Sequence, residues 1–462
     1  MKYIDEDKIN NLLVSEAKAG FDRLDAILEK AKSLKRLSLQ ESAALLSVSE
    51  PSYIQKIFAA ASFVKDKIYG RRVVLFAPLY ISNLCRNSCL YCAFKADNNL
   101  IKRKALTPPE IKSQTELLLR QGQKRILMVC GEASPQGQSS IDYYTEAVKA
   151  IYSAEVGKNK IKRVNVNCAP LSREEFKKLK KSGIGTYQLF QETYHQETYL
   201  RMHPKGPKSD PDNRLDAIDR AFAAGIDDLG IGLLYGLYDY RFETLSLLSH
   251  VEHMERNFNV GPHTISVPRI EPALGVEFSL NPPHKLSDDE FKKVVAVLRL
   301  SVPYTGIIMS TRETAQMRDL LLSLGVSQIS AASRTSPGGY SELSKADDDG
   351  QFSLSDHRSL DEIVGTLIKH DYIPSFCAAC YRKERTGEAF MQLAKPGTIK
   401  GKCSMNALIT LKEYLDDFAS KIVRAEGYKM IERYFKELDK ADQERLRLFF
   451  GHVDSGIRDE YV

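Results

Sequence analysis

Short apolar stretches alternate with longer amphipathic stretches along most of the chain from about residue 71. Each short stretch is rich in β-branched residues and is followed by a turn and then by apolar residues at helical spacing. This is the pattern of a strand followed by a helix. Eight such short stretches occur, at residues 71–81, 124–132, 162–170, 185–193, 227–236, 263–272, 305–313 and 327–335.

Strands that alternate with helices form parallel sheets through right-handed crossovers. Eight units predict a closed (β/α)8 barrel of the TIM type, in which functional residues gather at the strand ends; an open doubly wound sheet is the alternative. We therefore expect an α/β protein with N-terminal helices in residues 1–70, the barrel in 71–345 and a mostly helical domain in 346–462. The polar stretch 344–359 is expected to be a loop.

Composition and charge say little about the fold, but they exclude some classes of function. The 462 residues include 66 basic and 60 acidic side chains, scattered along predicted helices as on solvated helix faces rather than massed as in a nucleic-acid site. The chain starts without an apolar signal-like region and has no apolar run of about 18 residues. We expect a cytoplasmic protein that binds neither nucleic acid nor membranes, with its eight cysteines reduced.

Three of the cysteines fall within eight positions after the first predicted strand. Cys85, Cys89 and Cys92, in CRNSCLYC, have the spacing C-x3-C-x2-C. Three thiolates on a short loop suit a cubic iron–sulfur cluster, whose fourth iron then stays open to a substrate or cosubstrate. A structural zinc site is the alternative, but closed zinc sites use four ligands, and only Asn87 and Ser88 lie nearby.

A second group of cysteines lies in the C-terminal part. Cys377 and Cys380, in SFCAACYRKERTG, are followed by Cys403 with the spacing C-x2-C-x22-C. This spacing alone fits zinc as well as iron. Beside the first triad it favours a second iron–sulfur cluster, again with one iron free of protein ligands. Cys130 and Cys168 fall inside predicted strands, where a buried thiol acts as a small apolar side chain.

The motif CRNSCLYC at the end of the first strand of a predicted βα barrel resembles the radical S-adenosylmethionine (SAM) superfamily. The resemblance implies a [4Fe-4S] cluster whose open iron binds the amino and carboxylate groups of SAM, which is cleaved to a 5′-deoxyadenosyl radical. It also implies that Tyr91 packs on the adenine. Gly131 and Glu132, after the second strand, match the segment near the methionine amine, although Cys130 replaces one glycine of the usual pair.

Both cysteine motifs, together with GIGTYQLFQETYH, GLLYGLYDY, GPHTISVPRIEPA, VPYTGIIMSTRE and ISAASRTSPGGY, are similar to the tyrosine lyases of [FeFe]-hydrogenase maturation. The tyrosine lyases of thiamine biosynthesis share the barrel motifs but lack the C-terminal cysteines. The resemblance implies cleavage of L-tyrosine at Cα–Cβ to p-cresol and dehydroglycine. Dehydroglycine would then give carbon monoxide and cyanide on an additional iron at a second [4Fe-4S] cluster.

The same resemblance implies further ligands and partners. His263 matches the histidine that binds the additional iron, although a lone histidine at the start of a strand is more often structural. A free cysteine would bind at the auxiliary cluster, an electron donor of the ferredoxin or flavodoxin type would reduce the enzyme, and hydrogenase maturation proteins would receive the product. Arg334, after Ser333, stands where a smaller residue is usual, which could mark a divergent member.

The ends of the later strands supply candidates for the small molecules. Arg312, after the seventh strand, is the best candidate for a bidentate grip on the tyrosine carboxylate, which Ser333 could share. The alternative is an ion pair of Arg312 with Glu313 or a helix-capping role. Candidates for the ribose or amine of SAM are Gln191, Glu192, Arg269 and Glu271. Two other functions remain open: a lyase that stops at dehydroglycine or cleaves another amino acid, and a noncatalytic iron–sulfur scaffold.

Overall fold

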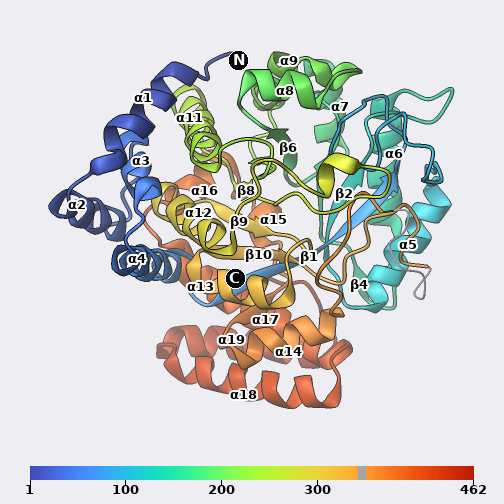
Figure 1. Ribbon diagram of the computed structural model, residues 1–462. Helices are drawn as coiled ribbons and strands as arrows, with labels where there is room; N and C mark the ends of the chain where they lie inside the picture. Colours follow the sequence, from blue (N-terminus) through green and yellow to red (C-terminus); the bar gives the residue numbers. More distant parts are fainter. Residues whose placement is uncertain (342–349) are drawn as a thin grey trace.

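The structure is a computed structural model that describes residues 1–341 and 350–462 (Figure 1). Eight parallel strands follow one another around a barrel, and the last pairs with the first through Val74 opposite Gln328. This confirms the predicted closed (β/α)8 barrel and excludes the open sheet. The barrel strands are β1 (Arg72–Ser82), β2 (Arg125–Cys130), β5 (Arg163–Asn167), β6 (Tyr187–Glu192), β7 (Leu229–Leu233), β8 (Thr264–Ser266), β9 (Gly306–Met309) and β10 (Val326–Ser330).

The helices between the strands form the outer ring, and several of them begin at capping boxes. Ser172 and Glu175 cap α7 reciprocally, and Ser287 and Glu290 cap α12 in the same way. The ring helices are α5 (Pro108–Arg120), α6 (Ser140–Ser153), α7 (Arg173–Lys181), α10 (Ala217–Ala223), α11 (Tyr240–Phe258), α12 (Asp288–Ser301) and α13 (Ala315–Leu324). Between them lie the hairpin β3 (Glu155–Val156) and β4 (Asn159–Lys160), and the short helices α8 (Gln196–Met202), η2 (Pro207–Ser209), α9 (Pro211–Leu215) and η3 (Glu277–Ser279).

The N-terminal helices lie along one side of the barrel, where α4 packs on α12 and α3 packs on α11 (Figure 1). They bury one apolar face each; in α4 the buried residues include Ile57, Val64 and Ile68. Their bounds are α1 (Glu6–Ser15), η1 (Glu16–Lys18), α2 (Phe21–Lys32), α3 (Leu39–Ser47) and α4 (Pro51–Tyr69).

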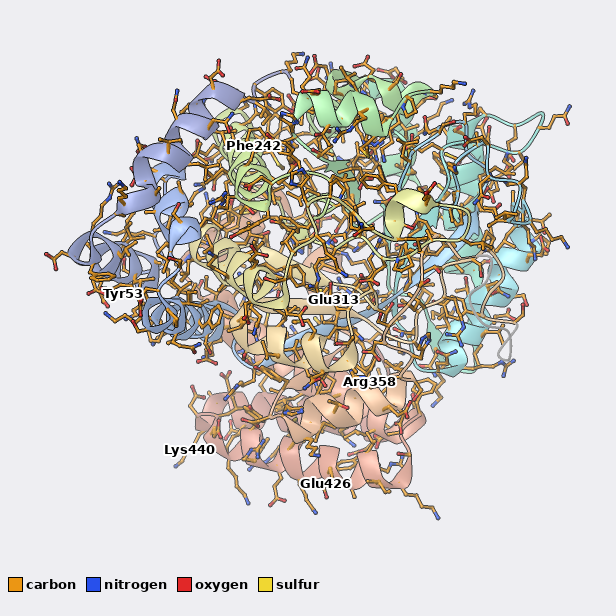
Figure 2. The ribbon with its side chains drawn as sticks, in the orientation of Figure 1. Tyr53, Phe242, Glu313, Arg358, Glu426 and Lys440 are labelled. Carbon is orange, nitrogen blue, oxygen red and sulfur yellow. The ribbon has the colours of Figure 1, made fainter. Side chains whose placement is uncertain are left out.

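The C-terminal region is mostly helical, as expected, and its helices α17, α18 and α19 lie at one end of the molecule (Figure 1). Glu426 and Lys440 extend from this region into solvent (Figure 2). The elements are α14 (Leu360–Lys369), β11 (Ile373–Ser375), α15 (Ala379–Arg382), α16 (Gly387–Ala394), α17 (Ile399–Asp417), α18 (Lys421–Glu437) and α19 (Lys440–Asp454). We keep the predicted domain limits at residues 70 and 345 as a proposal; residue 345 lies outside the described residues.

Strand β11, which the sequence analysis did not predict, connects the C-terminal region to the barrel. β1 is 11 residues long; its first residues pair with β11, through Arg72 opposite Ile373, and its later residues pair with β2. β11 therefore pairs with the first residues of β1, before the point at which β2 begins to pair with it. The loop after β11 contains Cys377, whose carbonyl accepts a hydrogen bond from Arg125 Nη1 at 2.6 Å. The C-terminal cysteines are thus held at the amino-terminal end of the barrel.

Among the described residues, no helix combines the length and the apolar character that a membrane span requires.

Candidate active site and second cysteine site

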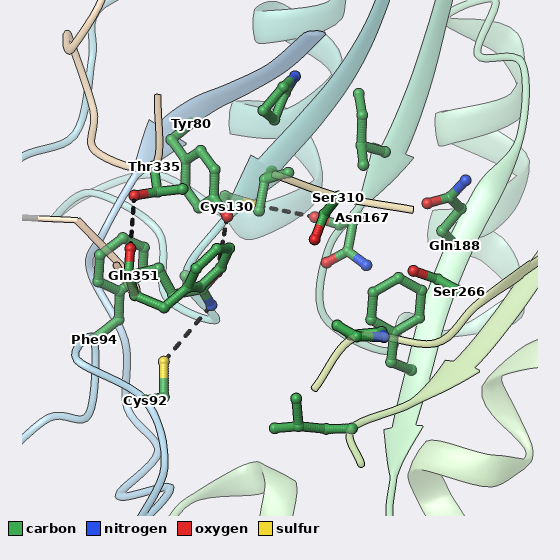
Figure 3. A pocket seen from close by; sticks show the side chains of 18 of the residues that line it. Tyr80, Cys92, Phe94, Cys130, Asn167, Gln188, Ser266, Ser310, Thr335 and Gln351 are labelled. Carbon is green, nitrogen blue, oxygen red and sulfur yellow. Dashed lines mark hydrogen bonds between the residues drawn. The ribbon is translucent and has the colours of Figure 1, made fainter. Parts of the chain in front are cut away.

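A cavity of about 180 Å³ opens at the carboxyl end of the barrel strands. Cys85, Cys89 and Cys92 line one side, on the loop that follows β1. Figure 3 shows side chains from several strand ends around this cavity. The other polar side chains in its wall include Asn87, Tyr91, Glu132, Glu192, Lys208, Arg214, Arg312, Ser333, Thr335 and Gln351.

The loop that carries the three cysteines is fixed by backbone hydrogen bonds to a neighbouring segment. Ser88 N–H donates to the carbonyl of Lys205 at 3.1 Å, and Leu90 N–H donates to that of Met202 at 3.0 Å. The pKa of the Cys92 thiol is raised to about 11, mainly by burial. Such a thiol keeps its proton at neutral pH until a metal displaces it. The thiols are free of disulfides, and their number and softness fit three irons of a cubic cluster.

Glycine at position 131 is required by the close approach of the cysteine loop. Gly131 N–H donates to the Ser82 carbonyl at 2.8 Å, which extends the pairing of β2 with β1. A Cβ atom at this position would lie 2.9 Å from the Leu84 carbonyl carbon and closer still to its oxygen. Gly131 therefore lies against Leu84, the residue that precedes Cys85.

Two carboxylates and two cations form a buried ion-pair group beside the cysteine loop. Glu132 pairs with Arg214 at 2.7 Å, and Glu192 pairs with Lys208 at 2.7 Å. Burial acts to raise the pKa of Glu132, but Arg214 and Lys208 outweigh it and hold that pKa below its usual value. Asn87 Nδ2 donates to Glu132 at 2.8 Å. The sequence analysis missed Lys208 and Arg214, which lie in the Pro- and Gly-containing segment after β6.

Tyr91 faces the same group. Its hydroxyl is 2.8 Å from His203 Nε2, and the Lys208 ammonium lies 5.6 Å from the ring centroid. The side chain lines the cavity, so a face of the ring can contact a planar ligand there.

Arg312 has no carboxylate within ion-pair distance in the part of the chain that the structure describes. Glu313 pairs with Arg269 instead, with Nε–Oε1 at 2.9 Å, so the alternative that Glu313 neutralises Arg312 is wrong. The Arg312 guanidinium carbon lies 3.3 Å from the centroid of the Phe352 ring. The buried Ser333 hydroxyl, which lines the same cavity, lacks a hydrogen-bond partner among residues 1–341 and 350–462. Both side chains are therefore available to a carboxylate ligand.

Three of the predicted SAM-binding residues, Gln191, Arg269 and Glu271, lie outside this cavity. The Gln191 amide donates to the Pro211 carbonyl at 3.1 Å, and Gln191 does not line the cavity. Arg269 pairs with Asp288 at 2.8 Å and lines a separate cavity together with Glu271. Of the strand-end candidates, Tyr91, Gly131, Glu132, Glu192, Arg312 and Ser333 are brought together with the first three cysteines.

A second cavity lies at the opposite end of the barrel, where the strands begin. Cys377, Cys380 and Cys403 line it together with His263, which directly precedes β8. His263 Nδ1 is 3.8 Å from Asp228, and its ring centroid is 4.4 Å from that of Phe390. The pKa of His263 is lowered to about 4, mainly by burial. The ring is therefore neutral at pH 7 and able to bind a metal.

The second cavity is strongly cationic. Its wall also contains Arg72, Arg125, Arg163, Arg385 and Lys402. Within the described residues, the buried Nε atoms of Arg72, Arg125 and Arg385 have no hydrogen-bond partner. A cluster held by three thiolates is anionic and accepts hydrogen bonds at its sulfurs, so this donor set fits such a group.

The described residues contain no group of three or more His, Cys, Asp or Glu side chains arranged to hold a single metal ion. A cubic cluster needs no such group, because each thiolate binds a different iron.

Comparisons with known proteins agree with this geometry. Residues 79–248 match the family model of the radical SAM superfamily, and residues 266–373 match that of the biotin and thiamin synthesis associated domain. The chain is 31% identical over 350 residues to 2-iminoacetate synthase of Escherichia coli, which covers 76% of this chain and 89% of that protein. The chain therefore belongs to the radical SAM superfamily and is a radical SAM lyase, which uses a [4Fe-4S] cluster and SAM.

Within the superfamily, the chain is similar to HydG along its whole length. The crystal structure of HydG, a maturase of the [FeFe]-hydrogenase, superposes with a TM-score of 0.96 at 44% identity and covers all of both chains. The X-ray structure of the FeFe-hydrogenase maturase HydG from Carboxydothermus hydrogenoformans superposes with a TM-score of 0.84 at 40% identity, over 96% of this chain and 97% of that one. The predicted resemblance is confirmed.

Proposed function

We propose that this enzyme cleaves L-tyrosine at Cα–Cβ to p-cresol and dehydroglycine, and converts dehydroglycine to carbon monoxide and cyanide for [FeFe]-hydrogenase maturation. The observation that carries the proposal is the second cavity, where His263 joins Cys377, Cys380 and Cys403 at the end of the barrel opposite the first triad. A lyase that stops at dehydroglycine has no use for that site.

The first cavity supplies the residues that the tyrosine step needs. Cys85, Cys89 and Cys92 would hold the cluster that supplies the electron for SAM cleavage. Tyr91 offers a ring face to adenine, and the charges of Glu132 and Glu192 suit the amine and ribose of SAM. The positive charge of Arg214, which pairs with Glu132, keeps that carboxylate ionised for this contact.

Arg312 and Ser333 would bind the tyrosine carboxylate. The guanidinium presents parallel N–H donors for a bidentate contact, and the Ser333 hydroxyl has no competing partner among the described residues. Loss of a hydrogen atom from tyrosine then breaks Cα–Cβ, and the 4-hydroxybenzyl fragment leaves as p-cresol after gaining an electron and a proton.

The barrel interior offers the path from the first cavity to the second. Phe76 and Ser330 line the first cavity and are paired across β1 and β10. Val74 and Gln328, the pair two positions earlier on the same strands, line the second. Two residues of a strand span about 7 Å, so one layer of side chains separates the cavities at these strands.

At the second cavity, Cys377, Cys380 and Cys403 would hold the auxiliary [4Fe-4S] cluster, and His263 would bind the additional iron through its neutral ring. The cationic wall suits the carboxylate of dehydroglycine or of a free cysteine bound there. A donor of the ferredoxin or flavodoxin type would supply electrons, and hydrogenase maturation proteins would receive the iron unit.

The test measures p-cresol, cyanide and carbon monoxide together, in anaerobic reactions with tyrosine, SAM and a reductant. Two reconstituted clusters correspond to about eight irons per chain. Cys377→Ala should keep p-cresol and lose cyanide and carbon monoxide, whereas Cys89→Ala should lose all three. Cys168→Ala is the matched control, because this buried thiol lines neither cavity. Release of p-cresol without cyanide by the unmodified protein would instead identify a lyase of the 2-iminoacetate synthase type.

A further inference from the structure

The segment from Gln351 to Ser355 contributes Gln351 and Phe352 to the wall of the first cavity, although its sequence suggests only a polar loop. Gln351 N–H donates to the Thr335 carbonyl at 3.1 Å, and the Gln351 carbonyl accepts from Ala93 N–H at 3.3 Å. Ser353 and Ser355 donate from their backbone N–H groups to Pro272 and Thr311 at 2.8 and 2.9 Å. The segment is therefore tied to the loops after β1, β8, β9 and β10, so its side chains have defined positions.

Gln351 contacts the cysteine loop directly, as Figure 3 shows. Its Nε2 lies 3.6 Å from Cys92 Sγ, and the Tyr80 hydroxyl donates to its Oε1 at 2.8 Å. A sulfur bound to iron carries no proton and can only accept a hydrogen bond. The amide must therefore turn Nε2 towards Cys92, and the Tyr80 hydroxyl fixes the amide in that orientation.

Phe352, the next residue, contacts Arg312, the residue proposed to bind the substrate carboxylate. Its ring lies against the Arg312 guanidinium at 3.3 Å, and its carbonyl accepts from the Thr335 hydroxyl at 3.2 Å. An aromatic face attracts a guanidinium without occupying its N–H donors. The ring can therefore hold Arg312 in place while leaving the donors available to a ligand.

We propose that Gln351 and Phe352 are positioning residues of this active site. Gln351 raises the reduction potential of the N-terminal cluster through an N–H···S hydrogen bond to Cys92, because such bonds stabilise the more negative, reduced cluster. Phe352 holds Arg312 ready for the substrate carboxylate. The role of Gln351 requires only the cluster, whereas the role of Phe352 rests on the proposed function.

The test of Gln351 is a redox titration of the cluster, followed by electron paramagnetic resonance, on anaerobically reconstituted protein without tyrosine. To isolate one cluster, every variant carries Cys377→Ala. Gln351→Leu should lower the ratio of reduced to oxidised cluster at a fixed potential about fivefold, or about 40 mV at 59 mV per tenfold. Gln351→Glu should lower it further, because a carboxylate lacks the N–H donor and adds negative charge.

Two further variants separate this effect from a disturbance of the segment. Thr335→Val removes the hydrogen bond to the Phe352 carbonyl but leaves the Gln351 amide, so the potential should stay unchanged. Tyr80→Phe frees the amide without removing it and should give a smaller shift in the same direction, even where Gln351→Leu fails to bind iron. An unchanged potential in Gln351→Glu and Tyr80→Phe, or an equal shift in Thr335→Val, would overturn the assignment.

The test of Phe352 compares KM and kcat for tyrosine. Phe352→Leu should raise KM about fivefold, keep kcat within twofold and leave the cluster potential unchanged, and Phe352→Tyr should restore KM. An unchanged KM, or a shifted potential, would refute the role of Phe352. If the unmodified protein leaves tyrosine intact, the proposed function and the role of Phe352 fail together, while the potential measurements on Gln351 keep their meaning.

Discussion

Replacement of Gly131 by alanine tests whether the close contact between β2 and the cysteine loop fixes the first cluster. The new methyl carbon would lie 2.9 Å from the Leu84 carbonyl carbon and 3.2 Å from that of Asn83. An ordinary carbon contact is about 3.5 Å or longer. The loop must therefore move by at least about 0.6 Å at Leu84, next to Cys85.

The expected cost follows from this overlap. Backbone atoms cannot rotate away as a flexible side chain can, so overpacking here should cost about 1–3 kcal/mol. Part of that cost is relieved if the backbone at Leu84 shifts away from β2 and moves the adjacent Cys85 with it. Gly131→Ala should therefore fold but hold the N-terminal cluster weakly.

The assay measures iron content, electron paramagnetic resonance and 5′-deoxyadenosine on anaerobically reconstituted protein. Gly131→Ala should lose about half of the iron and most of the 5′-deoxyadenosine, while the signal from the C-terminal cysteines persists. Gly451→Ala is the control, because Gly451 lies in α19 with no atom within 4 Å of an added Cβ. It should keep both clusters and gain up to about 1 kcal/mol in stability. Full iron and unchanged SAM cleavage in Gly131→Ala would refute the reasoning.

Three further predictions address other residues. Arg312→Lys should raise KM for tyrosine about tenfold in steady-state assays, because an ammonium cannot make the bidentate contact; an unchanged KM would place the carboxylate elsewhere. His263→Phe should keep p-cresol release but lose the additional iron and cyanide, measured by iron analysis and product assay, and retention of both would exclude His263 as the ligand. Burial raises the pKa of Glu243 to about 8, above the value in the unfolded chain. The contribution of the protonated Glu243 to the stability of the fold is therefore complete below about pH 4.5 and is lost as the pH rises through 8. Glu243→Gln should therefore unfold at a higher temperature than the unmodified protein at pH 9 but not at pH 5, and equal unfolding curves at pH 9 would contradict this.

The sequence was sufficient for the barrel and for the two cysteine groups, because their signals are local. β-Branched stretches and helix caps act within a few residues, and the spacing within each cysteine motif is itself the signal. β11 left no such signal, since it has three residues and includes Pro374. Its place beside β1 is a tertiary pairing, and this pairing brings the C-terminal cysteines to His263.

Errors at the strand ends have a different cause. The side chains of a strand alternate between its two faces, so a shift of one residue exchanges inside and outside. The pairing of β6 with β7 shifts between Phe190 and Glu192, and Glu192 has a φ of 71°. This irregularity turns Glu192 into the cavity and leaves Gln191 directed to Pro211. The sequence contains no signal for this shift, so it cannot tell which of the adjacent candidates, Gln191 or Glu192, faces the cavity.

The same strand geometry explains how one barrel serves two separate sites. β1 runs from Arg72, in the wall of the second cavity, to Ser82, just before the cysteine loop. Ten residues of strand span about 33 Å, so the two cysteine groups lie near opposite ends of the barrel, and in the proposed reaction a product would pass the layer of side chains that separates the two cavities.

Ordinary barrels of this kind fill their interior with layers of bulky branched side chains. Here two glycines leave room for two interior glutamine side chains. A Cβ at Gly230 would lie 2.7 Å from Gln188 Cγ, and a Cβ at Gly306 would overlap Gln328 Nε2. Gln188 lines the first cavity and Gln328 the second. Glutamine side chains can change rotamer and offer both donors and acceptors, so they add polar, adaptable groups to a layer that also contains Val74 and Phe76. In the proposed reaction, dehydroglycine would exchange hydrogen bonds with these glutamines during passage, whereas a layer of valine and leucine alone would exclude it.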